Sequence, residues 1–166
     1  MTTVTAGQIL SKLEKMHTQK PDHRALPDAF YTEVKTGRTQ PGYLRLDAVA
    51  IKKSRAKPCI IGYEIKVKRS DFLRDKKWQN YQKYCHEFWF VCPPGVVTLE
   101  DLDAVNCGDV GLIYYSAEHD TLFTKRRAMY RKIDLRSREM VGMLYYLAMY
   151  RANVNNSATL KAGENT

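Results

Sequence analysis

The chain has 166 residues, of which 44% are hydrophobic and 27% are charged, and it carries a net charge of +9 with a pI near 9.4. A chain of this length can bury a core, and we predict a single domain over residues 1–152. The excess of positive charge predicts an acidic polymer or an anionic surface as the partner. No apolar stretch reaches the length of a membrane span, which disfavours a membrane as that anion.

The four cysteines show no Cys-x-x-Cys spacing, which disfavours a zinc site. Cys59 falls in a predicted strand and Cys85 in a predicted helix, where a free cysteine behaves as a small hydrophobic residue. We therefore expect Cys59, Cys85, Cys92 and Cys107 to be reduced thiols of a cytoplasmic protein.

The N-terminal part predicts a helix followed by a strand or a short turn. Residues 5–17 carry apolar side chains at helical spacing, and Thr5 is a suitable N-cap. We interpret His17 as a favourable charge at the C-terminus of this helix rather than as a ligand. Residues 29–36, which contain Glu33, form the strand or turn that precedes Gly37.

Residues 43–52 and 58–67 predict two adjacent strands, because both are rich in β-branched and aromatic residues and a polar turn separates them. Side chains alternate along a strand, so Glu64 and Lys66 lie on the same face. A pairing that sets Asp47 beside Glu64 would gather two carboxylates and one amine on an apolar sheet. Such a cluster is costly to bury and favours a metal ion or a function, whereas an exposed strip of salt bridges is the alternative.

Two neighbouring carboxylates suit a hard divalent cation. Mg²⁺ prefers oxygen ligands and needs only one or two protein carboxylates when a substrate supplies phosphate oxygens, and Mn²⁺ can replace it. The cation would activate a water molecule and neutralise charge on a phosphoryl group. Lys66 could then orient that water or stabilise the developing charge.

This arrangement resembles the PD-(D/E)XK nuclease superfamily, with Asp47 in the place of its metal-binding Asp and Glu64-Ile65-Lys66 in the place of its (D/E)-x-K. The stretch from Glu64 to Cys85 is similar to the MmcB-type family of DNA-repair-associated proteins, and the resemblance covers roughly residues 27–95. One departure is Leu46, which stands where the superfamily motif has a proline.

The resemblance implies an α/β, restriction-endonuclease-like fold with a mixed β-sheet core flanked by helices. It implies a metal-dependent DNA endo- or exonuclease of DNA repair or processing, with Asp47, Glu64 and Lys66 as catalytic residues. It also offers Glu33 as a third metal ligand beside Asp47 and Glu64, since some branches of the superfamily have an upstream glutamate. An exposed Glu33 paired with Lys35 is the alternative.

Ser70 signals the start of a helix that we expect to run to Cys85. The superfamily often carries Gln-x-x-x-Tyr on this helix, and the present chain has Lys77-x-x-x-Tyr81. Lys77 could contact a phosphate, whereas the alternative is a packed Tyr81 with a solvated Lys77.

Residues 87–92 predict a buried strand beside the Glu64 strand, and residues 110–115 and 121–124 predict a hairpin at one side of the sheet. Residues 125–138 are basic, which predicts phosphate contacts or a solvated connector. The candidate nucleic-acid contacts are Lys68, Arg69, Lys77, Tyr81, Arg126, Arg127 and Arg131.

Residues 138–151 predict a helix with apolar side chains around almost its whole surface. One face of such a helix would pack on the core, and the other could contact a second copy of the chain in a homodimer. Residues 153–166 predict a flexible polar tail. The function that these observations favour is Mg²⁺-dependent cleavage of DNA. A binding or repair-accessory module that does not cleave is the alternative, and charge alone does not separate DNA from RNA.

Overall fold

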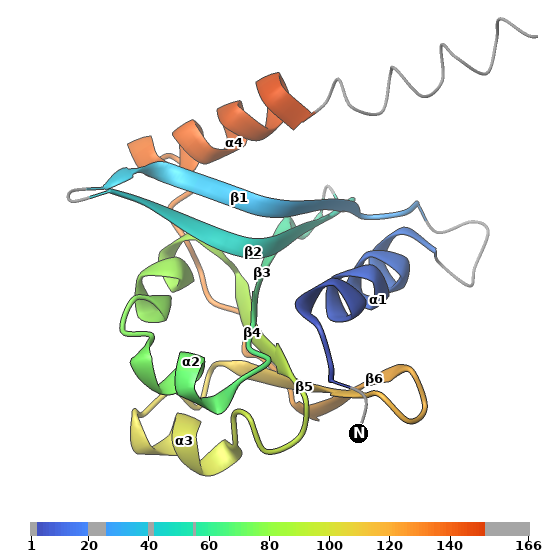
Figure 1. Ribbon diagram of the computed structural model, residues 1–166. Coiled ribbons are helices and arrows are strands. Elements are labelled where there is room, and N and C mark those ends of the chain that lie inside the picture. Colours follow the sequence, from blue (N-terminus) through green and yellow to red (C-terminus); the bar gives the residue numbers. More distant parts are fainter. Residues whose placement is uncertain (1–2, 20–25, 40–41, 55, 152–166) are drawn as a thin grey trace, which may run out of the picture.

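The computed structural model describes residues 3–19, 26–39, 42–54 and 56–151 (Figure 1). Six strands form one mixed sheet in the order β1-β2-β3-β4-β5-β6. The strands are β1 (Ala29–Thr39), β2 (Gly42–Lys52), β3 (Cys59–Ile65), β4 (Glu87–Cys92), β5 (Gly111–Ser116) and β6 (Thr121–Arg126). The central pairs β3–β4 and β4–β5 are parallel, and the outer pairs are antiparallel. The predicted tail, residues 153–166, lies outside the described residues.

Helices cover both faces of the sheet. Helix α1 (Ala6–Thr18) packs on one face, where Ile9 and Leu13 join a buried cluster with Tyr63 and Ile65 of β3. The other face carries α2 (Arg69–Arg74), the 3-10 helix η1 (Trp78–Tyr84), α3 (Leu99–Ala104) and α4 (Arg138–Arg151). The predicted α/β class, with a mixed sheet flanked by helices, is confirmed.

The central strands are buried on both faces, as their continuous apolar sequences predicted. Every residue of β3 is buried, and in β4 Phe88 and Phe90 face the α2 side while Val91 faces the α1 side. Gly62 in β3 is required by packing, because a Cβ at this position would collide with the Cys85 sulfur. The predicted hairpin of residues 110–115 and 121–124 is confirmed as β5 and β6 at one edge of the sheet.

The single helix predicted from Ser70 to Cys85 is wrong. Helix α2 has Lys68 as its N-cap residue and ends at Arg74. The backbone at Asp75 is extended, and the 3-10 helix η1 begins at Trp78. The physical reason is the core: the rings of Phe72 and Trp78 pack on Phe90 with centroids 5.4 and 5.1 Å away. Six positions apart on one straight α-helix, these two side chains would point about 120° from each other. The break at Asp75 lets both contact the same ring.

Helix α1 begins as predicted, with Thr5 as N-cap in a capping box with Gln8. His17 lies in the last turn of α1, as predicted, but its side chain is buried and bridges two elements. Its Nδ1 lies 2.8 Å from Asp28 Oδ2 and its Nε2 lies 2.7 Å from the Tyr63 hydroxyl. His17 therefore joins α1 to β3.

Helix α4 packs along β1, as Figure 1 shows. Met140, Met143 and Leu147 are buried in this contact, whereas Val141 and Tyr145 are exposed. Among the helices of the described residues, none is long and apolar enough to cross a membrane.

Candidate active site

The candidate site lies where β2 and β3 run side by side. The last pair of their antiparallel ladder is Ala48↔Tyr63, and one further step in this register sets Asp47 across from Glu64. Asp47 Oδ2 accepts the backbone N–H of Ile65 at 2.7 Å, which fixes the carboxylate against β3. The predicted neighbourhood of Asp47 and Glu64 is therefore present.

Lys66 follows β3 directly, and its side chain lies on the Glu64 side, as the alternation predicted. The backbone N–H of Lys66 donates to the Val91 carbonyl at 3.1 Å, which extends the contact with β4. The Lys66 amine donates to Glu64 Oε1 at 2.9 Å and to Asp75 Oδ2 at 2.7 Å. The side chains of Lys66, Glu64 and Asp75 are only 10%, 7% and 14% exposed, so this is not a solvated surface strip.

Asp75 is the site residue that sequence reasoning missed. It occupies the break between α2 and η1, where its Oδ1 accepts the backbone N–H of Lys77 at 2.8 Å and its Oδ2 accepts from Lys66. Had α2 continued, this side chain would have been one more residue of a helix surface. The signal in the sequence was the apolar pattern, since Phe72 and Trp78 do not share one face of a continuous helix.

The electrostatics of the cluster follow from burial. Desolvation, together with the nearby Asp47 charge, raises the pKa of Glu64 to about 8, and desolvation also raises the pKa of Asp47. Burial opposes the charge on Lys66, but Glu64 and Asp75 outweigh it and raise the pKa of the amine to about 12. Burial likewise opposes the charge on Asp75, and the hydrogen bond from Lys66 outweighs it, so the Asp75 pKa is lowered. At neutral pH the cluster therefore holds a charged Lys66–Asp75 pair beside a protonated Glu64.

Each of the two strand carboxylates has one oxygen bound to the protein. Asp47 uses Oδ2 for the Ile65 N–H and Glu64 uses Oε1 for Lys66, whereas Glu64 Oε2 is buried without a hydrogen-bond partner. In the part of the chain that the structure describes, no group of three or more His, Cys, Asp or Glu side chains could hold a metal ion. A cation at this place would thus depend on the Asp47–Glu64 pair and on oxygens from elsewhere, a ligand set that suits Mg²⁺.

Glu33 is not brought to this pair by any interaction of the described residues. Its side chain is 68% exposed, and its Oε1 lies 3.6 Å from Arg45 Nη1 rather than at Lys35. The backbone at Glu33 has a φ of 51°, an uncommon conformation for a non-glycine residue.

Tyr81 is a packing residue whose hydroxyl also lies near the cluster. Its ring is buried and tilted against Phe88 with centroids 6.3 Å apart, so it is a packing residue. Burial and then the charges of Glu64 and Asp75 raise the pKa of its hydroxyl to about 12, so the hydroxyl also lies in the field of the cluster. Lys77 is exposed, as is Lys68 at the start of α2.

Three of the candidate phosphate-binding arginines are engaged within the protein. Arg69 makes two hydrogen bonds of 2.8 Å to Asp101, and Arg126 lies 2.6 Å from Asp103 while donating to the Val110 and Cys107 carbonyls. The Arg131 guanidinium lies 2.8 Å from Asp109, and its side chain is 18% exposed. Arg127 is exposed. The net charge of the chain therefore overstates how many arginine side chains are free to bind a phosphate.

Neither a protein-family model nor a curated protein matches this chain. Among solved structures it is similar to the SPO1766 protein of unknown function from Silicibacter pomeroyi, with a TM-score of 0.61 and 18% sequence identity. The match covers 99% of this chain and 98% of that chain. At this identity the likeness shows a shared fold and nothing about activity.

Proposed function

We propose that this protein is a Mg²⁺-dependent nuclease that hydrolyses phosphodiester bonds in DNA. The observation that carries the proposal is the buried Glu64 carboxyl, whose Oε2 has no hydrogen-bond partner and which lies beside Asp47. Burying two carboxylates side by side is costly, and a divalent cation relieves that cost. The resemblance of Asp47 and Glu64-x-Lys66 to the PD-(D/E)XK motif, and to the MmcB-type family, supports the same reading.

Asp47 and Glu64 would hold the cation through the oxygens that the protein does not use. Both are hard donors that suit Mg²⁺ and its substitute Mn²⁺, and phosphate oxygens of a substrate would complete the coordination. When bound, the cation supplies a water of lowered pKa and neutralises charge on the phosphoryl group. Glu33 is exposed and paired with Arg45, so we assign it no part in this site.

Lys66 supplies a fixed positive charge at the reacting centre. Its amine, with a pKa raised to about 12, is protonated at neutral pH, and the hydrogen bonds to Glu64 and Asp75 hold it in one orientation. A preorganised cation of this kind stabilises negative charge that develops in the transition state. Asp75 is the positioning residue that keeps the amine in place.

DNA binding would rest on exposed cations of the chain. Lys68, Lys77 and Arg127 face solvent, and the chain carries a net charge of +9. We propose a role in DNA repair or processing because of the resemblance to the MmcB-type family. We propose a cytoplasmic location because the four cysteines are free thiols.

A homodimer through α4 is a further proposal, because its outer face is apolar. Val141, Tyr145 and Met149 recur every four residues and are 52%, 64% and 52% exposed. Light scattering of the wild type and of Tyr145→Glu measures this, and a monomer in both samples would end the proposal.

The decisive experiment incubates the protein with labelled single-stranded, duplex and branched DNA and with RNA, in Mg²⁺, Mn²⁺ or EDTA. We expect metal-dependent cleavage of DNA by the wild type and none by Asp47→Asn. Asp71→Asn is the matched control, because Asp71 forms only an exposed ion pair with Arg74 at 3.0 Å.

Calorimetric titration of Mg²⁺ or Mn²⁺ accompanies the assay. Metal binding without cleavage of any substrate would favour the non-cleaving, DNA-binding module on this fold. A wild type that binds neither cation would contradict the proposed metal site.

A further inference from the structure

The paired strands β1 and β2 continue past β3, next to the candidate active site. The ladder between β2 and β3 ends at Ala48↔Tyr63, whereas β1 and β2 stay paired as far as Thr39↔Gly42. The part of β2 that precedes Asp47 therefore forms a two-stranded ribbon with β1, which Figure 1 shows extending beyond β3. Asp47 lies where this ribbon leaves the sheet.

One face of the ribbon carries two cations beside Asp47. Lys35 and Arg45 are register partners in the antiparallel pair, so their side chains lie on the same face. Arg45 stands two residues before Asp47 in β2, which places it on the Asp47 face as well. Both cationic side chains are exposed. Burial raises the pKa of Asp47, and the charge of Arg45 is among those that oppose this rise, so the two groups lie within electrostatic reach of each other.

A cross-strand pair of like charges is unfavourable for folding. Two cations directly opposite each other in an antiparallel pair repel, and such pairs destabilise a sheet. The pair of Lys35 and Arg45 therefore does not serve the stability of the ribbon. An anion bound by both cations would relieve the repulsion, and a phosphate of a nucleic-acid backbone is such an anion.

Glu33 gives Arg45 a weak partner within the protein. The register of β1 and β2 sets Glu33 across from Asp47, yet its carboxylate Oε1 lies 3.6 Å from Arg45 Nη1. The Glu33 backbone has a φ of 51°, a left-handed conformation that is strained for a residue with a Cβ. An exposed ion pair of this length is weak, so a phosphate can displace the carboxylate from Arg45.

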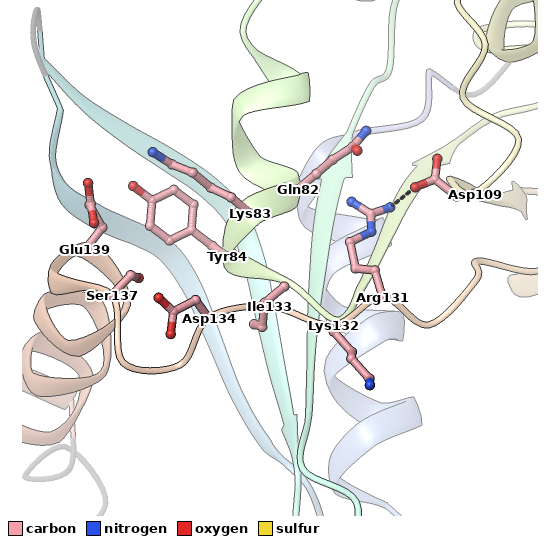
Figure 2. Close-up of a pocket in the computed structure, with 10 residues that line it drawn as sticks. All are labelled: Gln82, Lys83, Tyr84, Asp109, Arg131, Lys132, Ile133, Asp134, Ser137 and Glu139. Carbon is pink, nitrogen blue, oxygen red and sulfur yellow. Dashed lines mark ion pairs between the residues drawn. The ribbon is translucent and has the colours of Figure 1, made fainter.

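Positive charge on the ribbon is less balanced than elsewhere on the surface. A pocket of about 470 Å³ between η1, residues 131–134 and the start of α4 is lined by three cations and three carboxylates. Figure 2 shows one of these cations, Arg131, in its ion pair with Asp109 at 2.8 Å. On the ribbon, Glu33 pairs with Arg45, and Lys35 has no ion pair with any residue that the structure describes.

We propose that Lys35 and Arg45 bind a backbone phosphate of DNA beside the Asp47 site, and that Glu33 holds Arg45 until this phosphate replaces it. The inference rests on the proposed function, since it places the bound DNA at the candidate active site. Two residues of a strand span about 6.6 Å, and each DNA strand has one phosphate per about 3.4 Å of helix axis. Arg45 would therefore contact a phosphate one or two nucleotides from the one that is cut, whatever the base sequence.

Anisotropy titration of fluorescent duplex and single-stranded DNA, in EDTA at several salt concentrations, tests this without cleavage. We expect Arg45→Ala and Lys35→Ala each to lower the log–log salt slope, by about 0.9 on the duplex and about 0.7 on a single strand. Glu33→Gln should keep the slope and tighten binding about two- to fivefold, because it frees Arg45 from a weak pair. Lys53→Ala is the matched control, because Lys53 is exposed beyond the other end of β2 and should change neither quantity.

Two further measurements separate phosphate binding from a structural role. Lys35→Ala removes a like-charge contact, so its Tm should be unchanged or raised while its DNA binding weakens. Arg45→Lys keeps the positive charge and should retain the salt slope of the wild type.

Unchanged salt slopes in both Arg45→Ala and Lys35→Ala would overturn the proposal, and metal-dependent cleavage by the same samples in Mg²⁺ would show that the nuclease is unaffected by its failure. Lowered slopes without cleavage of any DNA by the wild type would support the phosphate site and contradict the nuclease. A Glu33→Gln variant that binds DNA no more tightly than the wild type would overturn the role given to Glu33.

Discussion

Replacing Glu64 by glutamine should stabilise the protein in EDTA while abolishing its binding of divalent cations. Glutamine has the shape of the protonated glutamic acid that burial imposes, so it should keep the packing of β3 and a carbonyl oxygen for the Lys66 amine. What it removes is the ionisable carboxyl group, so the charge at this position no longer changes with pH. The variant therefore separates the energetic cost of Glu64 from its structural role.

The size of the effect follows from the raised pKa. Glu64 titrates near 4.5 when unperturbed and near 8 in the folded protein, so between these values the folded state binds more protons than the unfolded state. Stability contributed by the protonated carboxyl is fully present below pH 4.5 and is lost as the pH rises through 8. At pH 7 the gap from the unperturbed value is about 2.5 pH units, which at 1.36 kcal/mol per unit corresponds to about 3 kcal/mol. Glu64→Gln should recover this amount at pH 7 and almost none of it at pH 4.

Urea denaturation followed by tryptophan fluorescence, in EDTA at pH 4, 5.5, 7 and 8.5, measures the difference. Glu118→Gln is the matched control, because Glu118 is an exposed residue in the turn between β5 and β6 and should show no pH-dependent difference. A Glu64→Gln variant that is no more stable than the wild type at pH 7 and 8.5 would contradict the raised pKa of Glu64. Retained Mg²⁺ binding in the variant would refute the assignment of Glu64 as a ligand.

Four further outcomes are expected. Mg²⁺ binding to the wild type should release protons and tighten about tenfold per pH unit below 8, because the cation displaces the Glu64 proton; calorimetry in buffers of different ionisation enthalpy measures this. Lys66→Ala should bind metal and DNA normally and lose about 10²- to 10³-fold in kcat, and full activity would contradict its role. Asp75→Asn should lose about 10- to 100-fold in kcat, with an altered pH profile and unchanged metal affinity. Arg127→Ala should lower the log–log salt slope of DNA binding by about 0.9, whereas Arg126→Ala should lower Tm without changing that slope.

The strands and the Asp47–Glu64–Lys66 cluster were predictable because they depend on short-range regularities. The predicted strand at residues 87–92 has the observed bounds, since a buried strand between two others is a continuous apolar run ended by prolines. Lys66 shares a face with Glu64 because of the two-residue period of a strand, which needs no tertiary information.

Asp75 was not predictable by the same means. Its position depends on where α2 stops, and α2 stops because Phe72 and Trp78 both pack on Phe90, a contact between segments that are distant in sequence. Arg126 and Arg131 show a second limit, because the sequence alone does not tell a basic residue that pairs with a carboxylate of another segment from one that faces solvent.

The charge of the cluster links these observations to the proposed cation. Asp47, Glu64 and Asp75 act on one another electrostatically, and Lys66 is the amine bound to two of them. With all four groups ionised, three carboxylates and one ammonium leave two negative charges in a buried place. Without a cation, burial and then the Asp47 charge raise the pKa of Glu64 to about 8, so this carboxyl is protonated at neutral pH and the charge of the cluster is reduced. One divalent cation would balance both charges and leave Glu64 ionised, whereas one further lysine added to the cluster would balance only one. The charge of the cluster therefore fits the single Mg²⁺ that we propose.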